Sequence, residues 1–144
     1  MKKILPQANN LNTLIKVFIY YSNKKECSLQ DIADFCNFEI RQASYYLNAC
    51  VFLGLIDEDN KLSQIGKEII TDVSTIRQSI YIRIITDDLI GKIFSQLLIK
   101  PKENIKDFTC KLILENYPDY SMSVIERRAS TIINWCQEII EYVK

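Results

Sequence analysis

Residues 38–55 read FEIRQASYYLNACVFLGL, and this stretch decides the fold. Apolar residues recur in it at helical spacing, which predicts a helix from about Ile40 to Phe52. Gly54 follows that run closely, and a glycine with left-handed backbone ends many helices. On a helix wound at about 100° per residue, the residues expected to face the core are Ile40, Ala43, Leu47, Cys50 and Val51.

The opposite side of this predicted helix is largely polar. Arg41, Tyr45, Asn48 and Phe52 are expected there, with Gln42 adjacent. Arg, Gln and Asn side chains can pair bidentately with the edges of guanine or adenine in DNA. Spacing alone leaves two interpretations open, a helix that reads DNA or a surface helix with an ordinary solvated face.

Two shorter helices are predicted before this stretch. Apolar residues at helical spacing indicate a helix over about 11–21. Ser28 and Asp31 have the spacing of an N-cap and a first-turn carboxylate, which predicts a second helix to about Cys36. Asn37 is expected to end it.

A small β-hairpin is predicted after the stretch, because two short apolar segments flank a polar turn over residues 55–63. Ser63 is then expected to cap a helix that runs to about Ile70. Three helices followed by a hairpin have the order of a winged helix-turn-helix. The predicted fold class is therefore mainly α, with a winged helix-turn-helix over residues 1–72.

A second, winged-helix-like helical subdomain is predicted over residues 73–144. Helices are expected at about 75–86, 88–99 and 104–116, and Asp87–Asp88 is expected to cap the second of these. Ser123 and Glu126 have the spacing of a capping box, which would open a final helix to about Val143.

The final helix is expected to repeat the layout of the first key helix. Its predicted core stripe consists of Ile125, Ala129, Ile132, Ile133, Cys136 and Ile140. Its far face is predicted to carry Arg127, Thr131, Asn134 and Glu138, with Arg128 and Trp135 near the edge. Two arginines near a helix N-terminus suit phosphate binding. Ion pairs of the same arginines with Glu126, Asp119 or Asp87 are the alternative.

Composition excludes several classes of site. The chain has 144 residues with 18 basic and 18 acidic side chains, three glycines and no histidine. A histidine-based triad, a histidine general base and histidine-ligated zinc are therefore excluded. No Gly-rich phosphate loop is present. A basic excess, the usual first indication of nucleic-acid binding, is also missing.

Cysteine usage and hydropathy indicate a cytoplasmic protein. The five cysteines are odd in number and include no C-x-x-C pair, which favours reduced, buried thiols over a disulfide framework. No apolar run approaches the roughly 20 residues that cross a bilayer, and no apolar leader follows Lys2 and Lys3.

The sequence predicts no catalytic centre. A Mg²⁺-dependent nuclease typically carries P-D followed by [DE]-x-K. The P-D pair, Pro118–Asp119, precedes Glu126–Arg127–Arg128, which lacks the lysine. Asp59–Asn60–Lys61 lies in the predicted turn, where Asp and Asn are common turn residues. We therefore expect no enzyme activity, no metal and no cofactor.

The motifs resemble those of a known class of module. Residues 38–49 and 53–55 match the pattern F-x-x-R-Q-x-x-Y-Y-x-x-A … LGL of winged-helix modules that accompany bacterial restriction–modification systems. Residues 62–66 match L-[ST]-x-x-G, and residues 127–135 match R-R-A-x-T-x-x-x-W. The similarity extends from about Leu5 to Tyr142. The sequence departs from the pattern at Gln137–Ile139, where a second aromatic residue is common.

The resemblance implies a tandem winged-helix unit that recognises double-stranded DNA for a type II restriction endonuclease or a related defence protein. It implies DNA contacts by Arg41, Gln42 and Tyr45 from one helix and by Arg127, Arg128 and Thr131 from the other. A nuclease or methyltransferase subunit would be a partner.

Two other functions stay open at this point. One is a protein–protein interaction module, favoured by the zero net charge and by Phe52 on the expected polar face. The other is a small transcriptional regulator, working as a homodimer, that uses the same helices on an operator.

Overall fold

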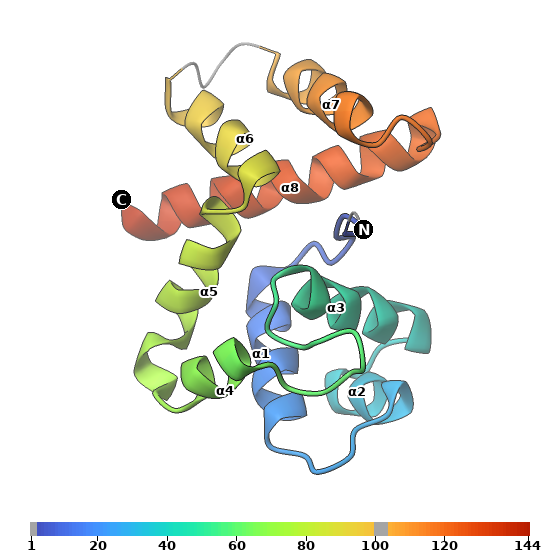
Figure 1. Cartoon of the computed structure of the whole chain (residues 1–144), viewed down its shortest axis with the longest axis vertical. Coiled ribbons are helices and arrows are strands. Elements are labelled where there is room, and N and C mark those ends of the chain that lie inside the picture. Colours follow the sequence, from blue (N-terminus) through green and yellow to red (C-terminus); the bar gives the residue numbers. More distant parts are fainter. Residues whose placement is uncertain (1–2, 100–103) are drawn as a thin grey trace. The chain divides into compact units, whose positions relative to one another are not determined.

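The computed structural model describes residues 3–99 and 104–144, and Figure 1 shows its course. These ranges are mainly helical and contain no strand. The contacts divide the chain into two compact units, Met1–Ile80 and Tyr81–Lys144. This division falls later in the chain than the expected boundary after Asp72.

The first unit contains the three helices that the sequence predicts, close to their predicted bounds. They are α1 (Leu11–Ser22), α2 (Leu29–Cys36) and α3 (Ile40–Phe52). They are followed by α4 (Gln64–Ile70), the short 3-10 helix η1 (Val73–Thr75) and the first residues of α5 (Ile76–Ile85). Helix α3 packs against both α1 and α2. The core between these helices includes Leu11, Leu14, Phe18, Ile32, Ala43 and Leu47.

The ends of α2 are set by local hydrogen bonds. The Asp31 amide donates to Ser28 Oγ (3.1 Å) and the Ser28 amide donates to the Asp31 carboxylate (3.0 Å), so the predicted cap is present as a full capping box. The bond from the Ser28 amide lowers the pKa of the Asp31 carboxyl. Asn37 ends the helix in the left-handed conformation, with φ of 59°, as the sequence predicts.

Helix α3 ends in a Schellman turn at Gly54. The glycine has φ of 74°, and the Leu55 amide donates to the Cys50 carbonyl at 3.0 Å. The Gly54 amide donates to the Val51 carbonyl, also at 3.0 Å. Both bonds satisfy carbonyl groups that a helix end leaves open, which accounts for a glycine at this position.

The predicted β-hairpin is reduced to a short closed loop, which we call the bridge loop (residues 57–61). Ile56 and Leu62 form a single antiparallel bridge at its base. Asp57 Oδ1 accepts hydrogen bonds from the amides of Asp59 and Lys61, each at 3.0 Å. These side-chain bonds fold the segment into a tight turn, and Ser63 then starts α4 at once. A strand has no room to extend.

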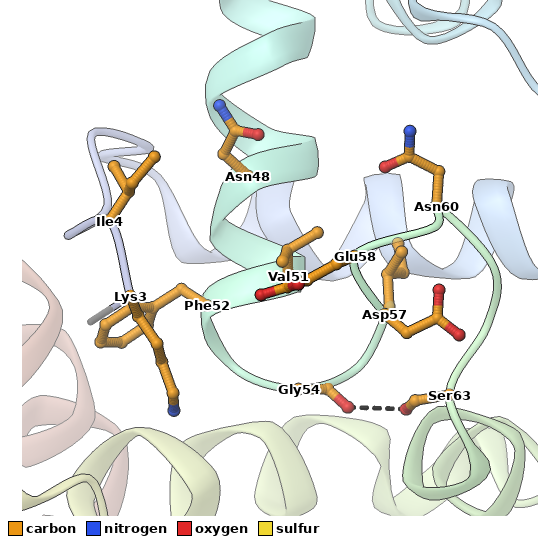
Figure 2. Close-up of a pocket in the computed structure, with 11 residues that line it drawn as sticks. Lys3, Ile4, Asn48, Val51, Phe52, Gly54, Asp57, Glu58, Asn60 and Ser63 are labelled. Atoms are coloured by element: carbon orange, nitrogen blue, oxygen red, sulfur yellow. Dashed lines mark hydrogen bonds between the residues drawn. The ribbon is translucent and has the colours of Figure 1, made fainter. Parts of the chain in front are cut away.

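Ser63 and Gly66 attach α4 to the end of α3. Ser63 Oγ donates to the Gly54 carbonyl at 2.6 Å, which Figure 2 marks with a dashed line, and accepts from the Gly66 amide at 2.9 Å. A Cβ atom on residue 66 would lie 2.2 Å from the Leu55 carbonyl oxygen. The L-S-x-x-G pattern of residues 62–66 therefore has a local structural reason, a cap and a close backbone approach.

The second unit consists of the rest of α5 with α6 (Asp88–Ile99), α7 (Ile105–Asn116) and α8 (Met122–Val143). Helix α8 packs against α6 and α7, and these two also contact each other. Trp135 is the largest fully buried side chain of the described residues. Asp87 accepts a hydrogen bond from the Ile90 amide at 3.1 Å, so it caps α6 as the sequence predicts.

The predicted capping box of the final helix is wrong. The N-cap of α8 is Ser121, whose hydroxyl accepts from the Val124 amide at 3.3 Å, and Ser123 lies inside the first turn. The Tyr120 amide donates to the Tyr117 carbonyl at 3.1 Å. This turn ends at Tyr120 and Ser121 follows it directly, so the helix begins two residues earlier than the Ser123–Glu126 spacing indicates.

Candidate nucleic-acid interface

The polar face predicted for α3 is present, except at its last residue. Arg41, Gln42 and Asn48 are exposed, and Tyr45 is half-buried. Arg41 Nε donates to the Tyr45 hydroxyl at 2.6 Å, and the guanidinium carbon lies 5.8 Å from the centre of the same ring. The ring holds the guanidinium in place while its two terminal nitrogens keep their N–H donors for a ligand.

Two residues of α3 lie on the side opposite to the one expected. Ile40, expected in the core, is 48% exposed, and Phe52, expected on the polar face, is 4% exposed. The Lys3 Nζ atom lies 5.2 Å from the centre of the Phe52 ring. Ile40 is the first residue of the helix. Val51, also expected in the core, is half-buried.

Tyr46 has a structural role that spacing alone did not reveal. It is buried, and its hydroxyl accepts a hydrogen bond from the Asn10 amide at 3.1 Å. Asn10 is the N-cap of α1, where its side chain accepts from the Thr13 amide. The bond therefore connects the start of α1 to the middle of α3. Adjacent Tyr45 and Tyr46 thus differ in environment, one half-exposed and one buried.

Charge is uneven around α3. Asp57, Glu58 and Asp59 are exposed on the bridge loop, and Asn48 lines a cavity together with Asp57 and Glu58. Three carboxylates on one loop repel phosphate groups. The N-terminal half of α3, with Arg41 and Gln42, is therefore the part best suited to an anionic ligand.

The second predicted contact helix, α8, carries one exposed cation near its beginning. Arg127 is exposed and forms no ion pair with another residue of the described ranges. The guanidinium of Arg128 lies 5.8 Å from the ring centre of Tyr120, which stacks on Tyr117 at 4.8 Å. This ring contact positions Arg128 near the beginning of α8.

Thr131 is not on the exposed face where the sequence places it. It is 2% exposed, and its hydroxyl donates to the Arg127 carbonyl at 3.2 Å. Trp135, expected at the edge, is fully buried, whereas Ile133 and Ile140 of the expected core stripe are half-buried. Because α6 and α7 both pack on α8, the buried face is rotated relative to the predicted stripe.

The five cysteines are free thiols. Cys50 and Cys136 are buried, and burial raises the pKa of each to about 12. Cys27, Cys36 and Cys110 are half-buried, and burial raises the pKa of these thiols as well. A thiol with a raised pKa is a weak nucleophile near neutral pH.

Residues 3–99 and 104–144 contain neither a metal-binding cluster nor a membrane-spanning helix. No group of three acidic or cysteine side chains is arranged to hold a metal ion. None of the helices there combines the length and the apolar character needed to cross a membrane.

The chain belongs to a family described as a domain of unknown function (DUF7226), whose model matches residues 14–144. The match begins inside α1 and covers both units. No curated protein and no solved structure matches the chain.

Proposed function

We propose that this chain is a DNA-binding module built on the winged helix-turn-helix plan. Helices α2 and α3 are the helix-turn-helix pair, and the bridge loop takes the place of the wing. One observation carries the proposal. The second helix of the pair exposes Arg41, Gln42 and Asn48, and Tyr45 holds the guanidinium of Arg41. In such pairs, residues near the start of the second helix reach base edges in the major groove.

Each side chain of this face has a distinct task in the proposal. Arg41 pairs with O6 and N7 of a guanine, and Gln42 pairs with an adenine, contacts worth about 1–3 kcal/mol each in base discrimination. Tyr45 orients Arg41. Asn48 contacts an adenine or a phosphate further along the helix.

Arg127 and Arg128 supply the second part of the interface in this proposal. Both lie in the second turn of α8. They contact phosphates, which sets the position of the protein on the duplex and contributes affinity for every sequence alike.

The charge balance sets the strength of binding. The net charge is zero, and the carboxylates of the bridge loop repel phosphates. Binding to random DNA is therefore weak, and the contacts of α3 determine which sequence is bound.

The resemblance of the motifs supports a place in a restriction–modification or related defence system. In that setting the chain acts in the cytoplasm as the sequence-recognition part and has no catalytic centre or cofactor of its own. A nuclease or methyltransferase subunit carries out the reaction. A homodimer would recognise a palindromic site.

Fluorescence anisotropy tests the proposal. Duplexes are selected from a random library, and binding is measured at several salt concentrations. Four to six phosphate contacts predict a slope of log K against log salt of about −3.6 to −5.4. Arg41→Ala should reduce the preference for the selected duplex by about ten-fold or more.

Lys67→Ala is the matched control, because Lys67 is an exposed cation on α4, which packs on α1 and η1. It should leave the sequence preference unchanged. Failure of the chain to bind even the selected duplex at about micromolar concentration in about 50 mM salt contradicts the proposal.

A protein–protein interaction module is the second candidate, and one observation favours it. Ile40 is 48% exposed beside Arg41, and Phe35 is also exposed on α2. The burial of Phe52 removes the apolar residue expected on this face. Binding of a protein partner through Ile40 would be insensitive to salt, whereas DNA binding would not.

A further inference from the structure

We propose that the cavity at the C-terminal end of α3 binds a small organic cation, an amine on an apolar body, and that this ligand weakens DNA binding through Asn48. The binding site for the amine does not depend on the proposed function. Only the effect of the amine on DNA binding rests on the proposed function.

The cavity lies within the first unit and has a volume of about 480 Å³. Its walls come from three segments, namely the last turns of α3, the bridge loop, and residues 3–4 near the N-terminus, as Figure 2 shows. Its size falls in the range of ligand-binding cavities in proteins, which is about 300–1,000 Å³.

Apolar side chains form much of the surface of the cavity. Val51 and Phe52 contribute from α3, Ile56 from the base of the bridge loop, and Ile4 from the N-terminal segment. Phe52 and Ile56 are buried beneath neighbouring residues, so they are fixed in place. Ile4 is 66% exposed and Val51 is half-buried, so a ligand with an aromatic or aliphatic body would bury apolar surface against these two side chains.

The charged groups of the cavity favour a cation. Asp57 and Glu58 line it against a single cation, Lys3. In Figure 2 the Glu58 side chain extends from the bridge loop toward Val51 and Phe52. Asp57 is held in place because its Oδ1 atom accepts two backbone amides, which leaves Oδ2 for a ligand.

One further feature also favours a cation. The C-terminal end of α3 carries a negative partial charge, which attracts cations within the last turn.

Asn48 connects this cavity with the face proposed to read DNA. It lines the cavity and is exposed on α3. A bound amine that contacts the Asn48 amide competes with the base or phosphate that the amide would contact. The two ligands then weaken each other's binding by the same factor.

Titration with phenethylamine, followed by two-dimensional amide NMR on the full chain, tests the site. An amine of about ten non-hydrogen atoms or fewer is expected to bind with a Kd of about 1 mM. The changes in amide chemical shift should be concentrated at Asn48, Phe52, Glu58 and Asn60. Phenylpropionate, an anion of similar shape, should shift these signals much less. The indole N–H of Trp135, which belongs to the second unit, should not respond.

Two variants make the test specific. Glu58→Gln should weaken phenethylamine binding about ten-fold, because it removes a charge-assisted contact. Glu68→Gln, at an exposed carboxylate on α4 outside the cavity, should leave it unchanged. The site is overturned if phenylpropionate binds as well as the amine, if Glu58→Gln binds like the wild type, or if about 10 mM amine shifts none of these signals.

Anisotropy then tests the effect on DNA. Saturating phenethylamine should lower the affinity of the wild type for its selected duplex about three- to ten-fold, and should not affect Asn48→Ala. An amine that binds by NMR but leaves DNA affinity unchanged overturns the effect and leaves the site standing. If no duplex is bound at all, the proposed function fails, and the NMR titration alone decides the site.

Discussion

Arg41 and Tyr45 lie one turn apart on α3, and the Arg41 Nε donates a hydrogen bond to the Tyr45 hydroxyl at 2.6 Å. The pair is exposed enough to meet a ligand, yet the guanidinium does not move freely, because it also lies over the ring. An arginine held in this way loses less side-chain entropy when it binds a base.

Tyr45→Phe should therefore relax base preference. The substitution removes the hydroxyl and keeps the ring, so the preference for the selected base at the Arg41 position should fall about five-fold, the equivalent of one hydrogen bond of ~1 kcal/mol. Anisotropy with the selected duplex and a singly substituted one measures this ratio. Tyr20→Phe, a half-buried tyrosine on α1, is the control. An unchanged ratio in Tyr45→Phe would show that the hydroxyl does not orient Arg41.

Arg127→Ala and Thr131→Val should differ in their effect on DNA affinity. Arg127 is exposed, so its loss should lower the affinity for all duplexes and reduce the salt slope by about 0.9. Thr131 is buried and bonded to the Arg127 carbonyl, so Thr131→Val should leave DNA affinity unchanged. Anisotropy at several salt concentrations separates the two. If Thr131→Val lost DNA affinity while its fold stayed intact, Thr131 would be a DNA contact after all.

Gly66→Ala should destabilise the protein. The added Cβ would lie 2.2 Å from the Leu55 carbonyl oxygen, and overpacking of this kind costs about 1–3 kcal/mol. Urea unfolding followed by circular dichroism measures the loss. Lys67→Ala, at the next residue, should change stability by less than about 0.5 kcal/mol. Equal unfolding midpoints for Gly66→Ala and the wild type would mean that α4 can shift away from Leu55 at little cost.

The thiols should differ in reactivity with the fold intact. Cys27, Cys36 and Cys110 are half-buried and should react with iodoacetamide, faster as the pH rises toward the raised pKa of each thiol. Cys50 and Cys136 are buried with a pKa of about 12 and should react only when the chain unfolds. Mass spectrometry of peptides after timed alkylation measures each rate. Early modification of Cys50 would show that α3 opens readily from its neighbours.

The same two thiols predict a loss of stability in alkali. The folded state keeps the thiol proton up to a pH of about 12, whereas the unfolded chain releases it near pH ~8.5. Stability is therefore unaffected below that pH and falls above it, by up to about 1.4 kcal/mol per pH unit for each thiol. Urea midpoints between pH 8 and 11 in a reducing buffer test this. The urea midpoint of Cys50→Ala should fall less steeply with pH than that of the wild type. Parallel curves would contradict the raised pKa of Cys50 as a cause of the decline.

The helices of the first unit lie close to their predicted bounds because the residues that set their ends act locally. Ser28, Asn37 and Gly54 each act on backbone groups a few residues away. Such caps can therefore be predicted from the sequence without knowledge of the fold. The choice between Ser121 and Ser123 failed for a related reason. Both residues can cap a helix, and the turn of Tyr117–Tyr120 decided between them.

The errors at the candidate site come from contacts between segments distant in the sequence. A helical wheel predicts that Phe52 and Thr131 face solvent, but it contains no information on the segment that covers Phe52 or on the two helices that pack on α8. The bridge loop differs from the predicted hairpin because one side chain, Asp57, takes two backbone amides. Arg41, Gln42 and Asn48 are exposed, as the helical wheel predicts.

The bridge loop is a position at which this chain can change in length. The Ile56–Leu62 bridge and the Ser63 hydroxyl close the loop at its base, so residues added at Glu58–Asp59 would extend into solvent without disturbing the core. Each doubling of a loop costs only about 0.6 kcal/mol in closure entropy. A longer basic loop in place of this short acidic turn would therefore add new ligand contacts while the helices of the first unit keep their places.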